Sequence, residues 1–191
     1  MEPRLVCPDD FGILSEHYYF VNRERFDLSL SELASVGITD DKCRIGQHLV
    51  EPLRRAQALF NLRHYDLVIK DGYRSPQLYQ LVFDKRTSRE GGDHFGKANT
   101  PKLLNMDRMI HASGDVVDID LRPQDGSSLR FRGSSDGVAA HTYGFYAGRQ
   151  DAESRQFQAN QDYMKNVMFK LGFKYGTLVE YWHFELPKID D

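Results

Sequence analysis

Apolar residues recur at helical and strand spacings in the first half of the chain. Helical spacing predicts a helix over residues 52–64, and Pro52 suits its first turn because proline has a fixed φ and needs no N–H there. Residues 65–70 form a short apolar run that is typical of a buried strand. Ser75 followed by Pro76 then has the form of a helix cap with proline at the first helical position, so a second helix is expected there.

The second half contains a strand with one acidic face, a long helix and a last strand. Acidic and apolar residues alternate over residues 116–121, which predicts the first strand. A helix that ends at Gly172, a residue suited to the left-handed C-cap, leads into a final strand over about residues 177–186. Residues 86–109 and 130–148 are polar and Gly-rich, and we expect loops there, the second of them beside an active site.

The N-terminal part is less regular. Residues 17–21 have the composition of a short strand, and residues 27–36 suit a short helix or an apolar arm laid on the core. The irregular order of helices and strands predicts an α+β fold, with helices packed on a small, mainly antiparallel sheet. We expect a single domain, in which residues 1–46 form an N-terminal arm and helix and residues 47–186 form the catalytic core.

The composition argues against a nucleic-acid-binding protein and against a membrane-spanning protein. The 191 residues suit one domain, and 40% of them are hydrophobic. The net charge of −3 with mixed signs gives no basic patch for nucleic acid, and no run approaches the roughly 18 apolar residues of a membrane span. The only cysteines, Cys7 and Cys43, do not form a disulfide framework, and no signal peptide is visible. We therefore expect a reduced, soluble, cytoplasmic protein.

The candidate chemistry begins in residues 178–185, where Glu180 and His183 stand in an apolar, aromatic run. Both side chains are costly to bury without a partner, and a metal ion is a common partner. Residues three apart in a strand point to opposite faces, so a bulge or strand end near Trp182 is needed to bring them together. Glu185 shares a face with His183, and strand period alone leaves it as a rival base.

Two further ligands are expected around a glycine bend. His111 precedes Gly114, and Asp118 follows in the predicted strand. The odd spacing would separate the two side chains in a straight strand, but the bend removes this objection. Asp120 lies on the same face as Asp118, so spacing cannot choose between the two aspartates. Catalytic zinc usually takes three protein ligands of these types and keeps a fourth position open.

Three segments together resemble a known family. Residues 109–118 read Met-Ile-His-Ala-Ser-Gly-Asp-Val-Val-Asp, residues 180–183 read Glu-Tyr-Trp-His, and residues 71–75 read Asp-Gly-Tyr-Arg-Ser. In this order they resemble the Ser-x-His-x-x-Gly-x-Ala-x-Asp, Glu-x-Trp-His and Asp-x-Tyr-Arg-Pro motifs of the zinc D-alanyl-D-alanine dipeptidases of vancomycin resistance and related metallo-DD-peptidases. The resemblance covers residues 45–186 and implies the metallo-DD-peptidase or hedgehog-like fold.

The resemblance also implies roles for individual residues. It implies one zinc ion per chain, held by His111, Asp118 and His183. It implies Glu180 as general base and acid and Arg74 as the stabiliser of the transition state. It thereby favours Asp118 over Asp120 and Glu180 over Glu185, by analogy. The substrate-binding residues that we expect are Asp136 for a substrate ammonium, Tyr73, Trp182 and Ser113.

The sequence departs from the family near the expected substrate pocket. Met109 replaces the family serine, Val116 replaces an alanine, and the proline after Arg74 is delayed to Pro76. The ligands are retained, so these departures bear on the substrate rather than on the metal chemistry. His94 and His141 lie in predicted loops. Substrate binding is one interpretation of these two histidines, but we expect exposed polar side chains there.

The leading hypothesis is zinc-dependent hydrolysis of D-alanyl-D-alanine or a related short peptidoglycan-type peptide that contains D-amino acids. Metal-activated water would attack the peptide carbonyl, and a DD-carboxypeptidase is a close variant. An alternative from another class is a non-catalytic zinc module that binds a peptide or protein. Two His and one carboxylate also form the ligand set of non-haem iron oxygenases, but their usual close His-x-Asp pair is missing and Glu180 would have no role.

Overall fold

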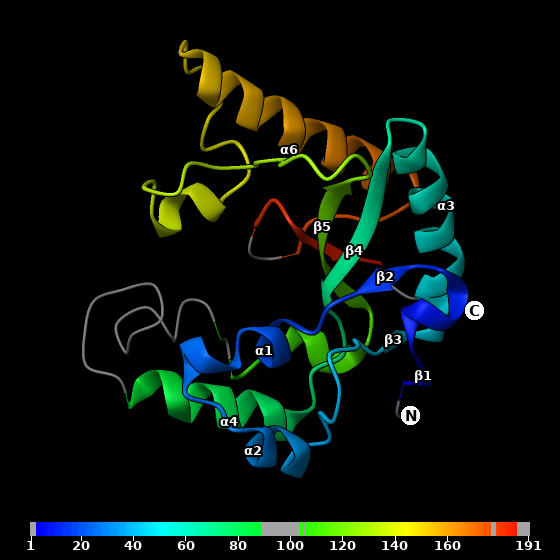
Figure 1. Cartoon of the computed structure of the whole chain (residues 1–191), viewed down its shortest axis with the longest axis vertical. Coiled ribbons are helices and arrows are strands. Elements are labelled where there is room, and N and C mark those ends of the chain that lie inside the picture. The colour runs from blue at the N-terminus through cyan, green and yellow to red at the C-terminus, as the bar shows by residue number, and fades with distance from the viewer. Residues whose placement is uncertain (1–2, 89–103, 105, 177–178, 187–191) are drawn as a thin grey trace.

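A four-stranded sheet forms the centre of the computed structural model, which describes residues 3–88, 104, 106–176 and 179–186 (Figure 1). Its strands, in the order in which they lie side by side, are β2 (Leu14–Ser15), β4 (Tyr65–Asp71), β5 (Val116–Pro123) and β6 (His183–Glu185). The pairs β4–β5 and β5–β6 are antiparallel, whereas β2 runs parallel to β4. The sheet is therefore mixed, because the N-terminal segment adds a parallel edge strand to the expected antiparallel strands.

A second, two-stranded sheet pairs β1 (Leu5–Val6) with β3 (Ile45–Gly46) in antiparallel fashion. Short 3₁₀ turns connect many of the larger elements. They are η1 (Pro8–Phe11), η2 (Arg23–Phe26), η3 (Gln47–Leu49), η4 (Ile110–Ser113) and η5 (Val138–His141).

The main core lies between one face of the sheet and two helices, α3 (Val50–Asn61) and α6 (Ala152–Lys170). Every second residue of β5, namely Val117, Ile119 and Leu121, enters this core. The intervening residues Asp118 and Asp120 therefore stand on the opposite face of the strand. Of the helices that the structure describes, none is both long and apolar enough to cross a bilayer.

A smaller apolar cluster joins α1 (Tyr18–Val21), α2 (Leu30–Ser35) and α4 (Pro76–Thr87), which gather at one end of the molecule in Figure 1. Its buried members are Tyr19, Phe26, Leu28, Leu33, Leu78, Tyr79, Val82 and Leu104. The segment between β2 and β3 and the segment between β4 and β5 thus pack on each other and build a second core beside the sheet.

Local signals placed several elements correctly. Ser75 caps α4 by accepting a hydrogen bond from the Leu78 N–H, as the serine–proline pair predicted. β4 and β5 occupy the predicted strands, and Gly172 adopts the left-handed conformation after α6, with a φ of 91°. Helix α3 begins two residues before Pro52, because a 3₁₀ turn leads into it.

Two predictions of secondary structure were wrong in type or extent. Within the strand predicted at residues 17–21, Tyr18–Val21 form the helical turn α1. Asn22 donates a side-chain hydrogen bond to the Tyr18 carbonyl, and the rings of Tyr18 and Tyr19 pack on Phe26. The final strand contains only His183–Glu185, because residues 181–182 form a turn before it. Most of the predicted loop at 86–109, including His94, lies outside the described residues.

Candidate metal centre

Cross-strand pairing brings the first two candidate ligands together. Asp118 on β5 lies directly opposite His183 on β6, and His183 Nδ1 donates a hydrogen bond of 2.8 Å to Asp118 Oδ1. Residues directly opposite in an antiparallel pair have Cβ atoms only about 4.5–5.5 Å apart, so the register alone makes this contact possible. The choice of Asp118 for this contact is therefore a consequence of how the two strands align.

His111 reaches the same point from the turn η4. Met109 and Gly114, with φ values of 39° and 76°, flank this turn in the left-handed region, which confirms the predicted bend at Gly114. The Gly72 carbonyl lies 2.8 Å from His111 Nδ1. If Nδ1 carries the proton for this hydrogen bond, Nε2 is left with a free lone pair, and Nε2 faces Asp118 Oδ1 at 3.7 Å.

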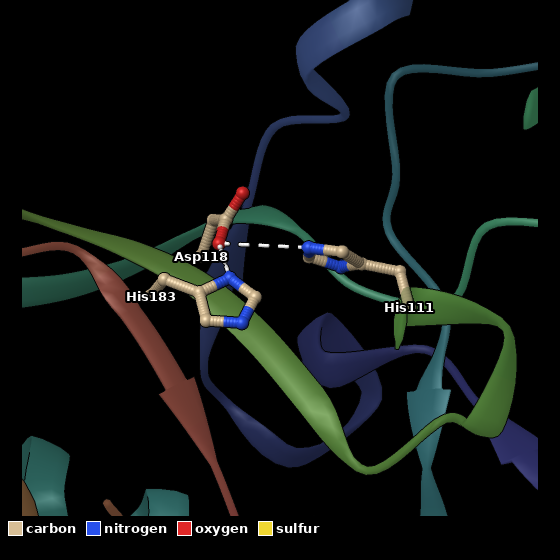
Figure 2. A group of neighbouring side chains, drawn as sticks. All are labelled: His111, Asp118 and His183. Carbon is tan, nitrogen blue, oxygen red and sulfur yellow. Dashed lines mark hydrogen bonds and ion pairs between the residues drawn. The ribbon is translucent and has the colours of Figure 1, made fainter. Parts of the chain in front are cut away.

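The three side chains converge on a common point (Figure 2). One ligand atom from each of His111, Asp118 and His183 lies within 4.8 Å of the others. Tetrahedral zinc with ligands at about 2.0–2.1 Å needs ligand atoms about 3.4 Å apart, close to the contacts of 2.8 and 3.7 Å. The donor set and its spacing therefore fit a zinc ion with small side-chain adjustments.

Glu185 stands behind His183 and away from the converging ligand atoms. Its Oε1 lies 3.6 Å from His183 Nε2, whereas His183 Nδ1 faces Asp118. Carboxylates in this position orient a metal-binding imidazole and raise its basicity. Of the two acids that strand period left open, Glu185 is therefore placed to orient His183 rather than to meet a substrate.

Glu180 enters the site through a reversal of the chain just before β6. It forms a β-bridge with Thr142, and the His183 N–H donates to the Glu180 carbonyl at 3.2 Å. This turn is the strand end that the sequence required near Trp182. Among the described residues, no hydrogen-bond donor or cation lies within bonding distance of the Glu180 carboxylate, which lines a cavity of about 420 Å³ together with Asp118 and Arg74.

The electrostatics separate the roles of these groups. Burial, reinforced by the negative charge of Asp118, raises the pKa of Glu180 to about 7. Burial lowers the pKa of His111 to about 4 and keeps it neutral. Burial alone would lower the pKa of His183, but the hydrogen bond to Asp118 and the nearby Glu185 raise it to about 10. In the metal-free chain His183 is therefore protonated, and its positive charge is stabilised by the carboxylates of Asp118 and Glu185. Zinc bound at His183 would displace this proton.

A bulge in β4 brings a buried ion pair to the same cavity. Ile69 pairs with Ile119, but Asp71 pairs with Asp118, so one extra residue is inserted and Asp71 turns to the face that carries Asp118. Arg74 binds Asp71 at 2.5 Å and lies over the ring of Tyr79 at 4.5 Å.

Asp71 and Arg74 keep each other ionised in spite of their burial. Burial would raise the pKa of Asp71, but Arg74 and two nearby histidines hold it below its usual range. Burial would conversely lower the pKa of Arg74, and Asp71 raises it. The guanidinium therefore remains charged where it lines the cavity.

The remaining predicted substrate residues have different surroundings. Trp182 lines the cavity, but Tyr73 lines a separate hollow beside Ser75. Ser113 is exposed and bonds within its own turn. Asp136 accepts hydrogen bonds from the Gly133 N–H and the Tyr146 hydroxyl, and it does not line the cavity.

Sequence reasoning missed several residues of the cavity wall. His141, expected to be exposed, is only 6% exposed and packs edge-on against Trp182 with ring centroids 4.7 Å apart. Arg86 and Arg132 also line the cavity. No local pattern marked these three residues, because they reach the site from a helix end and from the loop that precedes α6.

Comparison with known proteins gives likeness to solved structures alone. No family model and no curated protein matches the sequence. Among solved structures, the chain is similar to the LdcB LD-carboxypeptidase, whose structure is described as revealing the molecular basis of peptidoglycan recognition. The TM-score is 0.47 at 17% identity over 75% of this chain, and the match spans 59% of that protein's chain.

Proposed function

We propose that this protein is a zinc-dependent peptidase that cleaves D-alanyl-D-alanine or a related short peptide of the peptidoglycan type. The observation that carries the proposal is one cavity whose wall combines Asp118, a member of the His-Asp-His cluster, with the unpaired carboxylate of Glu180 and the buried guanidinium of Arg74. The resemblance of residues 109–118, 180–183 and 71–75 to the metallo-DD-peptidase motifs supports the choice of substrate.

The residues would divide the work of hydrolysis as follows. His111 Nε2, Asp118 Oδ1 and His183 Nδ1 would hold the zinc. When bound there, zinc supplies Lewis-acid chemistry, which polarises a carbonyl oxygen and makes water acidic enough to lose a proton near neutral pH. Glu180 would accept that proton as water attacks the peptide carbonyl, and would later donate it to the leaving amine.

Arg74 would act on the charge that develops during the attack. Its guanidinium is fixed in place by Asp71 and by the rings of Tyr19 and Tyr79, with distances of 5.0 and 4.5 Å from the guanidinium carbon to their centroids. A preorganised cation in a site with little water stabilises an oxyanion without first having to reorient. Asp71 would thus position Arg74, and Arg74 would meet the substrate.

The proposal can be tested by measuring zinc content and amine release on one sample. Zinc-loaded protein is incubated with D-alanyl-D-alanine and a panel of other dipeptides. We expect amine release that a chelator abolishes and added zinc restores. Glu180→Gln should retain zinc and lose about 10²- to 10⁴-fold in kcat, the usual contribution of a general base.

Glu51→Gln is the matched control, since it removes an exposed acid on α3 that pairs with Arg54. This variant should be as active as the wild type. No amine release from any peptide, or unchanged release by Glu180→Gln, would overturn the proposal. Zinc binding without any turnover would favour the non-catalytic zinc module instead.

A further inference from the structure

Tyr79 joins the second core to the candidate metal centre. It lies one turn into α4, where its N–H donates to the Ser75 carbonyl at 2.9 Å, and its side chain is only 2% exposed. It does not line the cavity, so a substrate bound there would not touch it. Any influence of Tyr79 on the reaction therefore has to pass through the residues that it contacts.

The hydroxyl of Tyr79 binds the backbone of a candidate zinc ligand. The His111 N–H donates to the hydroxyl oxygen at 3.0 Å, and both residues are buried. His111 belongs to the short turn η4. A buried N–H that loses its acceptor costs free energy, because no water takes the place of the lost partner. The phenol therefore fixes the position of η4 and, with it, the position of the His111 imidazole.

Two more hydrogen bonds tie His111 to the segment that leads to Tyr79. The Gly72 carbonyl lies 2.8 Å from His111 Nδ1, and the Arg74 N–H donates to the His111 carbonyl at 3.2 Å. The backbone N–H, the backbone carbonyl and Nδ1 of His111 are thus all bound by residues 72–79. Nε2 is left for the metal, as in histidine ligands whose second ring nitrogen bonds to a carbonyl.

The ring of Tyr79 contacts the other half of the site. The guanidinium carbon of Arg74 lies 4.5 Å from the ring centroid, and both side chains are buried. A cation over an aromatic face is held more strongly where water is excluded. The carboxylate of Asp71 binds the same guanidinium through a hydrogen bond. The ring and the carboxylate together therefore restrict the orientation of the guanidinium.

We infer that Tyr79 is a positioning residue that holds His111 and Arg74 at a fixed separation. Its hydroxyl acts on the zinc ligand and its ring acts on the guanidinium. The inference rests on the proposed function, in which His111 binds zinc and Arg74 stabilises the oxyanion. Both must be placed around the same carbonyl oxygen, because the metal and the cation stabilise the same developing charge. One side chain that contacts both residues keeps their separation constant.

Tyr79→Phe tests the hydroxyl, because it keeps the ring. The buried His111 N–H loses its acceptor, so zinc should bind about 10- to 100-fold more weakly, the usual effect of losing a group that supports a metal ligand. The affinity is measured by competition with a chromophoric chelator, which requires no turnover. At saturating zinc, kcat should remain close to that of the wild type, since the ring still contacts Arg74. Wild-type zinc affinity in this variant would overturn the inference.

Tyr146→Phe is the matched control. The Tyr146 hydroxyl also accepts a hydrogen bond from a backbone N–H, that of Gly133 at 2.9 Å, and its side chain is 1% exposed. This bond lies in the loop before α6 and does not involve a candidate ligand. The control should lose a similar hydrogen bond and bind zinc as the wild type does. Equal weakening of zinc binding in Tyr146→Phe and Tyr79→Phe would show a general loss of stability and contradict the positioning role.

Tyr79→Leu tests the ring. It should weaken zinc binding as Tyr79→Phe does and, in addition, lower kcat at saturating zinc by about 10-fold, within the range for a buried cation–π contact. In an Arg74→Ala background the same substitution should leave kcat unchanged, because no guanidinium remains to be positioned. If Tyr79→Leu lowers kcat equally in both backgrounds, Tyr79 does not act through Arg74 and the inference is wrong.

Two measurements separate this inference from the proposed function, because they need no hydrolysis. One is the zinc affinity, and the other is the nuclear magnetic resonance of the Arg74 Nε–H in the metal-free protein, which the neighbouring aromatic ring shifts. This resonance should move in Tyr79→Leu and much less in Tyr79→Phe. If the wild type cleaves no peptide, the proposed function fails and these measurements still decide the positioning role. If peptides are cleaved and zinc affinity is unchanged in Tyr79→Phe, the inference fails and the proposed function stands.

Discussion

The candidate metal centre and the loop of residues 130–146 each contain an aspartate that the sequence predicted for the site, Asp118 and Asp136, yet the two carboxylates have different partners in the fold. Asp118 faces two histidines from other segments of the chain. Asp136 turns back on its own loop, where the Gly133 N–H and the Tyr146 hydroxyl bind it at 3.1 and 2.6 Å. A carboxylate is available to a metal or substrate only where the fold has not already supplied its hydrogen-bond donors.

Gly133 allows the Asp136 carboxylate to lie directly against the backbone of the loop. A Cβ added at Gly133 would lie 2.3 Å from Asp136 Oδ2. The loop therefore needs glycine for this carboxylate to approach its backbone. Such an arrangement is typical of an aspartate that stabilises a loop, and the contrast with Asp118 can be tested by three experiments of decreasing expected effect.

The largest effect should come from Asp118, with Asp120 on the same face of β5 as its control. Asp118→Asn should weaken zinc binding by more than about 100-fold, beyond the 10- to 100-fold typical of losing a residue that only orients a ligand. Glu185→Gln should fall within that smaller range, because Glu185 lies behind His183. Asp120→Asn is the control and should retain one zinc per chain, as measured by elemental analysis. Zinc retention by Asp118→Asn would contradict the assignment.

A smaller effect is expected in the pH dependence of the metal-free protein. Burial raises the pKa of Glu180 from 4.5 to about 7, so the unfolded chain ionises first as the pH rises. The cost of keeping this carboxyl in the fold therefore grows from about pH 4.5 and levels off above pH 7. Glu180→Gln should raise the free energy of unfolding by about 1–3 kcal/mol at pH 8 and change it little at pH 4, as measured by urea denaturation.

Glu185→Gln is the matched comparison and should have the opposite sign. The hydrogen bond with His183 lowers the pKa of Glu185, so its carboxylate stabilises the fold above the unfolded pKa and loses that contribution as the pH falls. The Gln variant should therefore be less stable than the wild type at pH 8. Equal changes in both variants would show that the two acids do not differ in environment.

The smallest effect should come from Asp136. Asp136→Ala removes the partner of one N–H and one hydroxyl, and we expect a loss of about 1–2 kcal/mol in the free energy of unfolding. The KM for a free dipeptide should change less than about twofold, since the carboxylate does not line the cavity. Tyr146→Phe should lose part of the same stability. A tenfold rise in KM with unchanged stability would instead place Asp136 at the substrate.

Local patterns predicted the parts of the fold that depend on neighbouring residues. Ser75 with Pro76 predicted the start of α4, and Gly172 predicted the end of α6, because caps and left-handed turns involve residues close in sequence. The strand predicted at residues 17–21 was wrong. Aromatic residues favour strands, but here their packing on Phe26 stabilises a helical turn. His141 was equally unpredictable, as its burial depends on Trp182, far along the chain.

By itself, the sequence determined the chemical types available to the site: histidines and carboxylates in segments whose order resembles a metallopeptidase. Only the tertiary structure decided which of them meet. The β5–β6 register places Asp118 opposite His183, a turn presents Glu180, and a bulge turns Asp71 and Arg74 toward the cavity. Strand period fixes the face of a side chain, but contacts between strands depend on register and bulges, which are set by packing across the whole sheet.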